Sequence, residues 1–183
     1  MDINLIAFPW ITIKGYYDEK RLGTDELINS EEYDQLWDDS PDTWERLGDS
    51  YQFYHGVYSD TAALKQGSAF ETREELVAFS NTLVNEEYQS DLPVSEQDDC
   101  LVAAFSPEKV SELAKIASKI NFGAVEAAHR EIEENGLRFD GLDEPVQGVL
   151  EVDTKGYVAY LSGLAEFVKE VDGQQRGIVI HMG

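Results

Sequence analysis

The second half of the chain alternates short apolar runs with stretches of helical periodicity. Two of the apolar runs, residues 100–105 and 178–180, have the length of strands. Between them, apolar residues recur every three or four positions in three successive stretches, which predict helices over 107–120, 124–135 and 154–172. An amphipathic helix must bury its apolar stripe against another element. This order of elements therefore predicts an α+β fold.

Local signals mark the ends of these helices. Ser106-Pro107 opens the first, Asn135-Gly136 stops the second, and Asp153 or Thr154 caps the third. A further apolar run at 149–152 is a strand candidate. The side chains expected in the core are Val110, Leu113, Ala114, Ala117, Ile120, Val125, Ala128, Ile132, Tyr157, Tyr160, Leu161, Leu164, Val168 and Val171.

The first half of the chain is less regular. Its pattern predicts a strand over 3–8, extended structure over 10–13 up to a turn at Gly15, and a strand or strand-like loop over 51–58. Short helices are expected over 30–37 and 41–47, a helix opened by a Thr72–Glu75 capping box should continue to residue 84, and 89–99 should form a loop. The whole predicts one α+β domain over 1–183, with a small mixed sheet flanked by amphipathic helices.

Acidic residues dominate the composition. There are 37 Asp and Glu against 14 Lys and Arg, a net charge of −23. Such a surface argues against binding to nucleic acid or to anionic membranes, because both require basic side chains. No basic leader or long apolar run is visible, and Cys100 has no second cysteine to pair with. We therefore expect a soluble, cytoplasmic protein.

The negative charge is concentrated in residues 1–100, whose net charge is −17 against −6 for 101–183. It could simply keep the protein soluble, or it could form a docking face for a basic partner. Aromatic residues are interleaved with the acids, as in the Trp- and Tyr-rich centres of protein interfaces, although core packing would also explain them. The residues predicted to bind a partner are Glu31, Glu32, Asp34, Trp37, Asp38, Asp39, Asp42, Trp44, Glu45 and Tyr54.

Catalytic and metal-binding patterns are weak. Ser106 and Lys109 match an S-x-x-K motif, but Ser106 is better explained as a helix cap. Three histidines are too far apart in sequence for a paired metal motif. His129 should flank the stripe of its helix, His181 should follow the last strand, and His55 lies among tyrosines in a possible pocket. No catalytic residue, metal or cofactor is predicted.

Three segments of the second half resemble the YfbM-like family of uncharacterised bacterial proteins. They are the strand and helix from Ala104-Phe105-Ser106-Pro107 to Ile120, the helix from Tyr157 to Phe167, and the closing strand 177–180. Residues 42–47, around Trp44, are similar to a helix in the first half of that family. The resemblance implies a small α+β fold in the cytoplasm and supplies no catalytic residues. By analogy of class, small proteins of this kind resemble bacterial immunity proteins.

Two functional hypotheses follow. The first is a non-enzymatic, acidic binding protein of the immunity type, which occludes a basic surface or active site of a toxin or of a nucleic-acid-acting partner. The alternative is a small-molecule enzyme or ligand-binding domain with a pocket near His55 and its neighbouring tyrosines.

Overall fold

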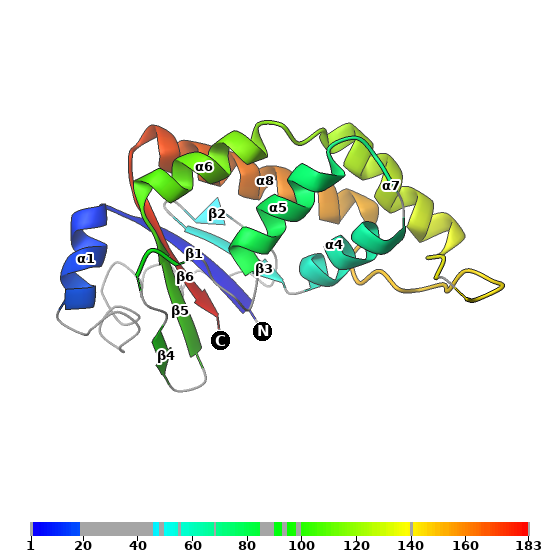
Figure 1. Ribbon diagram of the computed structural model, residues 1–183, viewed down its shortest axis with the longest axis horizontal. Coiled ribbons are helices and arrows are strands. Elements are labelled where there is room, and N and C mark those ends of the chain that lie inside the picture. The colour runs from blue at the N-terminus through cyan, green and yellow to red at the C-terminus, as the bar shows by residue number, and fades with distance from the viewer. Residues whose placement is uncertain are drawn as a thin grey trace.

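A computed structural model describes residues 2–18, 46–47, 50–54, 56–67, 69–84, 90–92, 95–97, 100–139 and 141–182. Within them, six strands form one sheet in the order β2-β3-β1-β6-β5-β4 (Figure 1). The strands are β1 (Asp2–Phe8), β2 (Arg46–Leu47), β3 (Ser50–Tyr54), β4 (Ser95–Gln97), β5 (Cys100–Phe105) and β6 (Gly177–Met182). The α+β class is confirmed, but neighbouring strands pair antiparallel throughout, so the sheet is not mixed.

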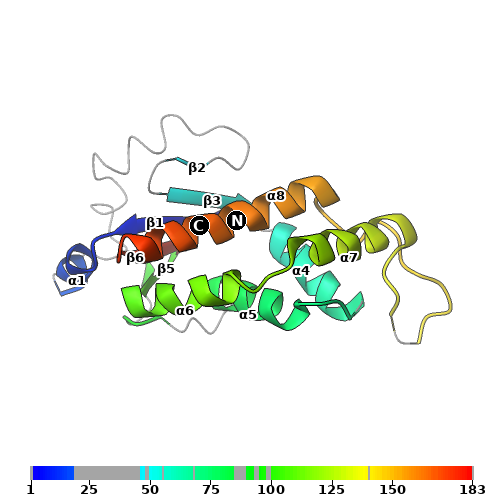
Figure 2. The same cartoon turned by 90° about the horizontal axis from the view of Figure 1, so that it is seen from above.

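Helices cover one face of this sheet and extend beyond its end (Figures 1 and 2). α6 and α8 lie side by side, α5 contacts α6, and α7 contacts both α8 and α4. The helices are α1 (Trp10–Asp18), α4 (Gly56–Gly67), α5 (Arg73–Val84), α6 (Pro107–Ala117), α7 (Phe122–Asn135) and α8 (Thr154–Gly173). Among the described residues, no helix is both long and apolar enough to cross a membrane.

The main core lies between the sheet and these helices. Alternate residues of a strand point to opposite faces, and paired residues share a face. Leu5 and Ala103 both pair with Ile180, and all three side chains are buried in this core. The same core contains the apolar stripes of α6, α7 and α8, whose predicted members are all buried. The sheet contacts α6 and α8, and α7 packs against α8.

The short helix α1 packs against the opposite face of the sheet. The buried side chain of Ile13 packs against Ala104 and Val179 there. Extended structure over 10–13 was therefore a wrong prediction, and so was the turn at Gly15, which lies inside the helix. The Pro9 carbonyl accepts the amides of Thr12 and Ile13 at 2.9 and 3.3 Å. Burial of Ile13 overrides the extended preference of a β-branched run.

The predicted starts of α6 and α8 are confirmed, whereas α6 ends three residues earlier than predicted and α7 begins two residues earlier. The side chains of Ser106, Asn121 and Asp153 each accept a backbone amide as N-caps of α6, α7 and α8. The helix predicted after Thr72 also forms, but without the expected use of the hydroxyl as a cap. Thr72 has a φ of 66°, and its Oγ1 accepts the amide of Asn121 instead.

Four other expectations are corrected. The strand predicted over 51–58 ends at Tyr54, and a helix that the pattern did not predict, α4, begins at Gly56. The expected loop 89–99 contains β4, and Arg46 and Leu47 form β2 in place of a helix end. Residues 149–152 have no strand partner, for a reason given below. The helix predicted over 30–37 lies outside the described residues.

Candidate functional site

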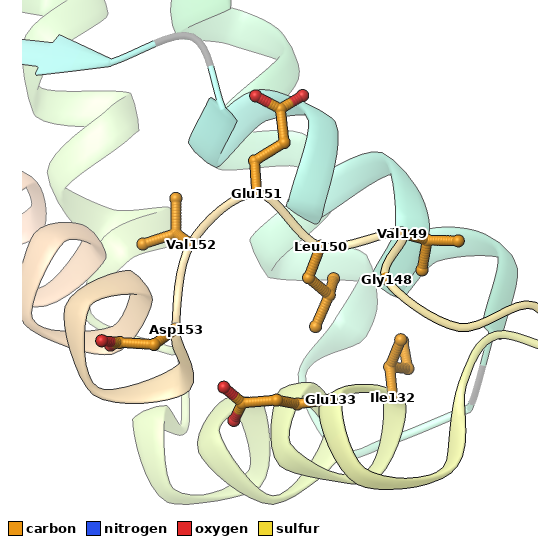
Figure 3. A pocket seen from close by; sticks show the side chains of 8 residues that line it. All are labelled: Ile132, Glu133, Gly148, Val149, Leu150, Glu151, Val152 and Asp153. Atoms are coloured by element: carbon orange, nitrogen blue, oxygen red, sulfur yellow. The ribbon is translucent and has the colours of Figure 1, made fainter.

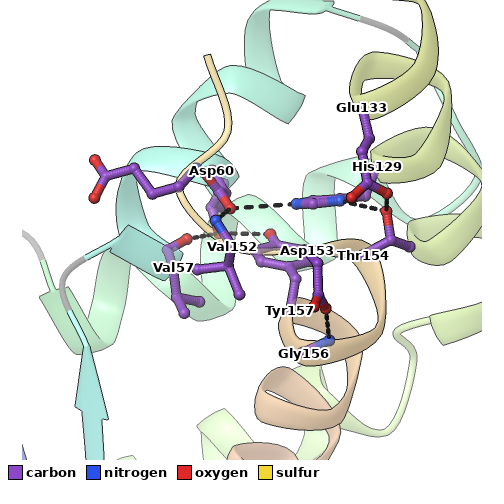
Figure 4. Close-up of polar contacts among 11 residues, drawn as sticks. Val57, Asp60, His129, Glu133, Val152, Asp153, Thr154, Gly156 and Tyr157 are labelled. Atoms are coloured by element: carbon purple, nitrogen blue, oxygen red, sulfur yellow. Dashed lines mark hydrogen bonds and ion pairs between the residues drawn. The ribbon is translucent and has the colours of Figure 1, made fainter. Parts of the chain in front are cut away.

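Buried polar side chains from three helices meet where α4, α7 and α8 come together (Figure 4). Asp60 and Thr61 come from α4, His129 from α7, and Thr154 and Tyr157 from the first turn of α8. Asp60, His129 and Tyr157 have no exposed surface. We call these five residues the buried polar network.

Asp60 accepts hydrogen bonds from a loop. Its Oδ1 accepts the backbone amide of Glu151 at 2.8 Å, and its Oδ2 accepts the amide of Val152 at 3.0 Å. Two consecutive amides that point at one carboxylate cannot pair with a neighbouring strand. Residues 149–152 therefore form a loop fastened to α4, although their apolar pattern is typical of a strand.

His129 connects Asp60 to the first residue of α8. Its Nε2 lies 3.3 Å from Asp60 Oδ2, and its Nδ1 lies 2.9 Å from Thr154 Oγ1. Thr154 donates its single hydroxyl proton to Glu133 Oε2 at 2.6 Å, so Nδ1 must be the donor toward Thr154. Both ring nitrogens of the buried imidazole then lie within hydrogen-bond distance of an oxygen, Thr154 Oγ1 on one side and Asp60 Oδ2 on the other.

Tyr157 closes the network on its other side. Its ring stacks on His129 with centroids 4.3 Å apart, and its hydroxyl lies 2.7 Å from Thr61 Oγ1. Because Thr61 already donates to the Val57 carbonyl, the phenol is the donor in this contact. Burial raises the pKa of the Tyr157 phenol above its usual value. The Thr61 hydroxyl opposes the rise, since it can turn toward a phenolate, and the charge of Asp60 adds to it.

The set Asp60, His129 and Thr154 has the composition of a hydrolytic triad. A triad needs a nucleophile that a substrate can reach, with its proton directed at the histidine. Thr154 instead directs its proton at Glu133, and it is buried. The geometry therefore fits a structural role, in which the network holds the 149–153 loop and α8 against α4 and α7.

A cavity of about 200 Å³ lies beside this loop (Figure 3). Ile132 and Glu133 of α7 form one wall, and residues 148–153 form the other. The side chains of Ile132 and Leu150 point inward, Glu133 extends toward Asp153, and the Glu151 carboxylate points away. Glu133 is exposed, so it links the buried polar network to this open cavity.

Most residues predicted to bind a partner cannot be placed. Glu31, Glu32, Asp34, Trp37, Asp38, Asp39, Asp42, Trp44 and Glu45 lie outside the described residues, and so does His55. Tyr54 lies at the end of β3, opposite Asp2. The structure brings together a different set of residues, the buried polar network and the cavity beside it.

The predictions for single polar residues have mixed outcomes. Ser106 is confirmed as a helix cap, because its hydroxyl accepts the Lys109 amide. His181 lies within β6, which runs to Met182, so its position after the last strand was wrong. His129 was expected beside the apolar stripe and is fully buried. A signal was present, since Val125, His129 and Ile132 share a helical face, but its partner Asp60 is 69 residues away.

Metal-ligating side chains do not converge in the part of the chain that the structure describes. There, no group of three or more His, Cys, Asp or Glu side chains could hold a metal ion.

The comparison with known proteins gives a fold. In sequence, the chain matches no family model and no curated protein. In structure, it matches a protein of unknown function, YfbM from Escherichia coli, with a TM-score of 0.51 and 11% identity over 100% of both chains. The resemblance inferred from the second half of the sequence is therefore confirmed, and this protein has a fold similar to that of YfbM.

Proposed function

We propose that this protein is a non-enzymatic, acidic binding protein of the immunity type, which occludes a basic surface or active site of a toxin or of a nucleic-acid-acting protein. The observation that carries the proposal is the net charge of −23 on 183 residues, together with its uneven distribution. Clustered charge of one sign accelerates association with an oppositely charged partner by about 10- to 1,000-fold at low salt.

The uneven distribution extends into the second half of the chain. Residues 131–153 contain eight acidic side chains and one basic side chain, Arg138. The rest of 101–183 contains six acidic and seven basic side chains. A requirement for solubility alone would spread the charge. Acidic residues are also concentrated within 31–49, with eight acidic side chains and one basic, and within 86–99, with six acidic side chains and none basic. These three local concentrations favour a directional role in binding.

The alternative function, a pocket near His55 and its neighbouring tyrosines, stays a prediction, because His55 lies outside the described residues. The cavity described above is lined by residues of α7 and of the 148–153 segment.

The test uses the product of the gene adjacent to this one, because immunity proteins are encoded beside their toxins. We expect that product to inhibit growth when expressed alone, and co-expression with this protein to restore growth. The purified pair should form a complex whose association rate falls steeply as salt rises from 50 to 500 mM. Absence of a complex would overturn the proposal.

Charge-reversal variants then locate the steering charge. Asp38, Asp39 and Asp42 changed together to Lys should slow association and flatten its salt dependence. The control changes Glu108, Glu112 and Glu166 to Lys, which alters the net charge equally at exposed sites on α6 and α8. Equal effects of both sets would mean that only the total charge matters.

A further inference from the structure

The loop that follows α7 exposes apolar side chains in an acidic setting. Within the described chain, four large hydrophobic residues are exposed, and three of them lie in this loop: Phe139 at 37%, Leu142 at 58% and Val146 at 37%. The fourth, Ile11 on α1, is isolated from them in sequence. Single exposed hydrophobic residues are ordinary, whereas three within eight positions concentrate exposed apolar side chains in one loop.

Backbone contacts hold this loop in a defined shape. Leu137 and Val146 exchange backbone hydrogen bonds of 2.9 and 2.8 Å across its base, and the Leu142 amide donates to the Phe139 carbonyl at 3.2 Å. Leu137 is buried in the main core, which anchors the base. Gly136 has a φ of 78°, and a Cβ there would lie 2.8 Å from the Val146 carbonyl oxygen. The loop that bears these apolar side chains thus projects from the end of α7, away from the sheet (Figure 1).

The charge around the loop indicates what kind of surface a partner must present. The eight acidic side chains of 131–153 surround these three apolar residues in sequence, with Arg138 as the one basic residue. A second copy of this chain would bring like charges together, and an anionic membrane would be repelled. The complementary surface is that of a protein with an apolar patch bordered by Lys and Arg.

The cavity adds a recess at the base of the loop. It begins at Gly148, two residues after Val146, and offers the apolar side chains of Ile132 and Leu150 with the carboxylate of Glu133 (Figure 3). Lys and Arg bury an apolar stem while the charged head meets an acceptor. The recess therefore fits a Lys or Arg side chain of the basic partner that the charge of the loop favours.

From these observations we propose that Phe139, Leu142 and Val146 form the anchoring face for a basic protein partner, with a Lys or Arg side chain of that partner entering the cavity beside Glu133. This inference rests on the proposed function and adds the place of contact. Distributed acidic residues set the association rate, whereas desolvated apolar anchors set the dissociation rate.

The experiment measures binding of the adjacent gene product to the full chain by surface plasmon resonance. Phe139→Ser with Leu142→Ser should raise the dissociation rate at least tenfold and leave the association rate within about twofold. Ile11→Ser is the matched control, because Ile11 is 79% exposed and lies outside the loop. It should leave both rates unchanged. Glu133→Gln, which can still accept from Thr154, should also raise the dissociation rate. Melting temperatures should match the wild type for the loop and control variants.

The outcomes separate this inference from the function on which it rests. If a complex forms and the loop variants dissociate from it at the wild-type rate, the anchoring face is overturned and the proposed function stands. An equal rise in dissociation rate for Ile11→Ser would also contradict the assignment of the anchoring face to this loop. Absence of any complex would overturn both. A dimer of the protein alone that Leu142→Ser dissociates would identify a second copy as the occupant and overturn the choice of a basic partner.

Discussion

Asp60 on α4 and His129 on α7 meet in the interior, with Oδ2 and Nε2 3.3 Å apart and neither side chain exposed. Asp60 also holds the amides of Glu151 and Val152, and His129 reaches Thr154 at the start of α8. This hydrogen-bonded pair therefore joins two helices, the start of a third, and the loop that forms a wall of the cavity. Because that loop is continuous with the proposed anchoring face, we expect the stability of the network to control the shape of the binding surface.

Asp60→Asn should lower the free energy of unfolding by about 3 kcal/mol, because the amide offers one acceptor where the carboxylate supplies two and leaves buried donors unpaired. Urea denaturation measures this loss. Hydrogen exchange should accelerate most at the Glu151 or the Val152 amide, because these two amides bind different oxygens of Asp60 and the Asn side chain keeps only one. Wild-type exchange at those two amides in the variant would contradict the role of Asp60.

Stability should also fall at high pH through Tyr157. Burial raises the pKa of this phenol above its ordinary value of about 10. A group whose pKa is raised on folding stabilises the protein fully below its unfolded pKa, and that stability is lost as the pH rises from about 10 through the folded pKa. Above pH 10, this one group should cost about 1.4 kcal/mol for each further pH unit.

Tyr157→Phe isolates that contribution. The variant loses the phenol hydroxyl. The Thr61 hydroxyl still donates to the Val57 carbonyl, so no buried donor is left without an acceptor. The measurement is the unfolding free energy of wild type and variant from pH 8 to pH 11.5. The difference between the two should be constant below pH 10. Above pH 10, the wild type should lose stability relative to the variant. Parallel curves would show that the phenol titrates at the same pH in the folded and unfolded protein.

The sequence predicted elements whose signals are local. Ser106 and Asp153 cap their helices, and the stripes of α6, α7 and α8 are buried as their spacing indicates, because caps and periodicity act within a few residues. The resemblance to the YfbM-like family also depended on these segments.

Elements decided by distant contacts were not predictable in this way. Residues 149–152 have the pattern of a strand, but the carboxylate of Asp60, about 90 positions earlier, captures two of their amides. Trp10–Asp18 is helical because Ile13 fills the second face of the sheet against Ala104 and Val179. The candidate site was missed for the same reason, since His129 acquires its partners only when α4 and α8 meet α7.

A carboxylate in the stripe of α6 should prevent folding. Leu113 is 1% exposed and belongs to the main core, so Leu113→Asp would bury an unpaired charge and should cost more than about 4 kcal/mol. Leu142→Asp makes the same change in the exposed loop and should leave the melting temperature within about 2 °C of the wild type. The two variants are compared with the wild type by their soluble expression and by their thermal unfolding. A cooperative transition at the wild-type temperature for Leu113→Asp would contradict the assigned core.

Gly177 lies where α1 packs against the sheet, and it should not accept a side chain. A Cβ at this position would lie 2.7 Å from the Phe105 carbonyl oxygen and 2.9 Å from Cδ1 of Ile13. Gly177→Ala must therefore displace either the β5–β6 pairing or α1, and it should cost about 1–3 kcal/mol. Gly173→Ala is the matched control, because nothing lies within 4 Å of its Cβ, and alanine at the end of α8 should be neutral or stabilise by up to about 1 kcal/mol. Chemical denaturation of the pair measures both values. A loss at Gly173 as large as that at Gly177 would contradict the role of the contact with α1, because the lower entropy of the unfolded alanine chain can only stabilise the fold.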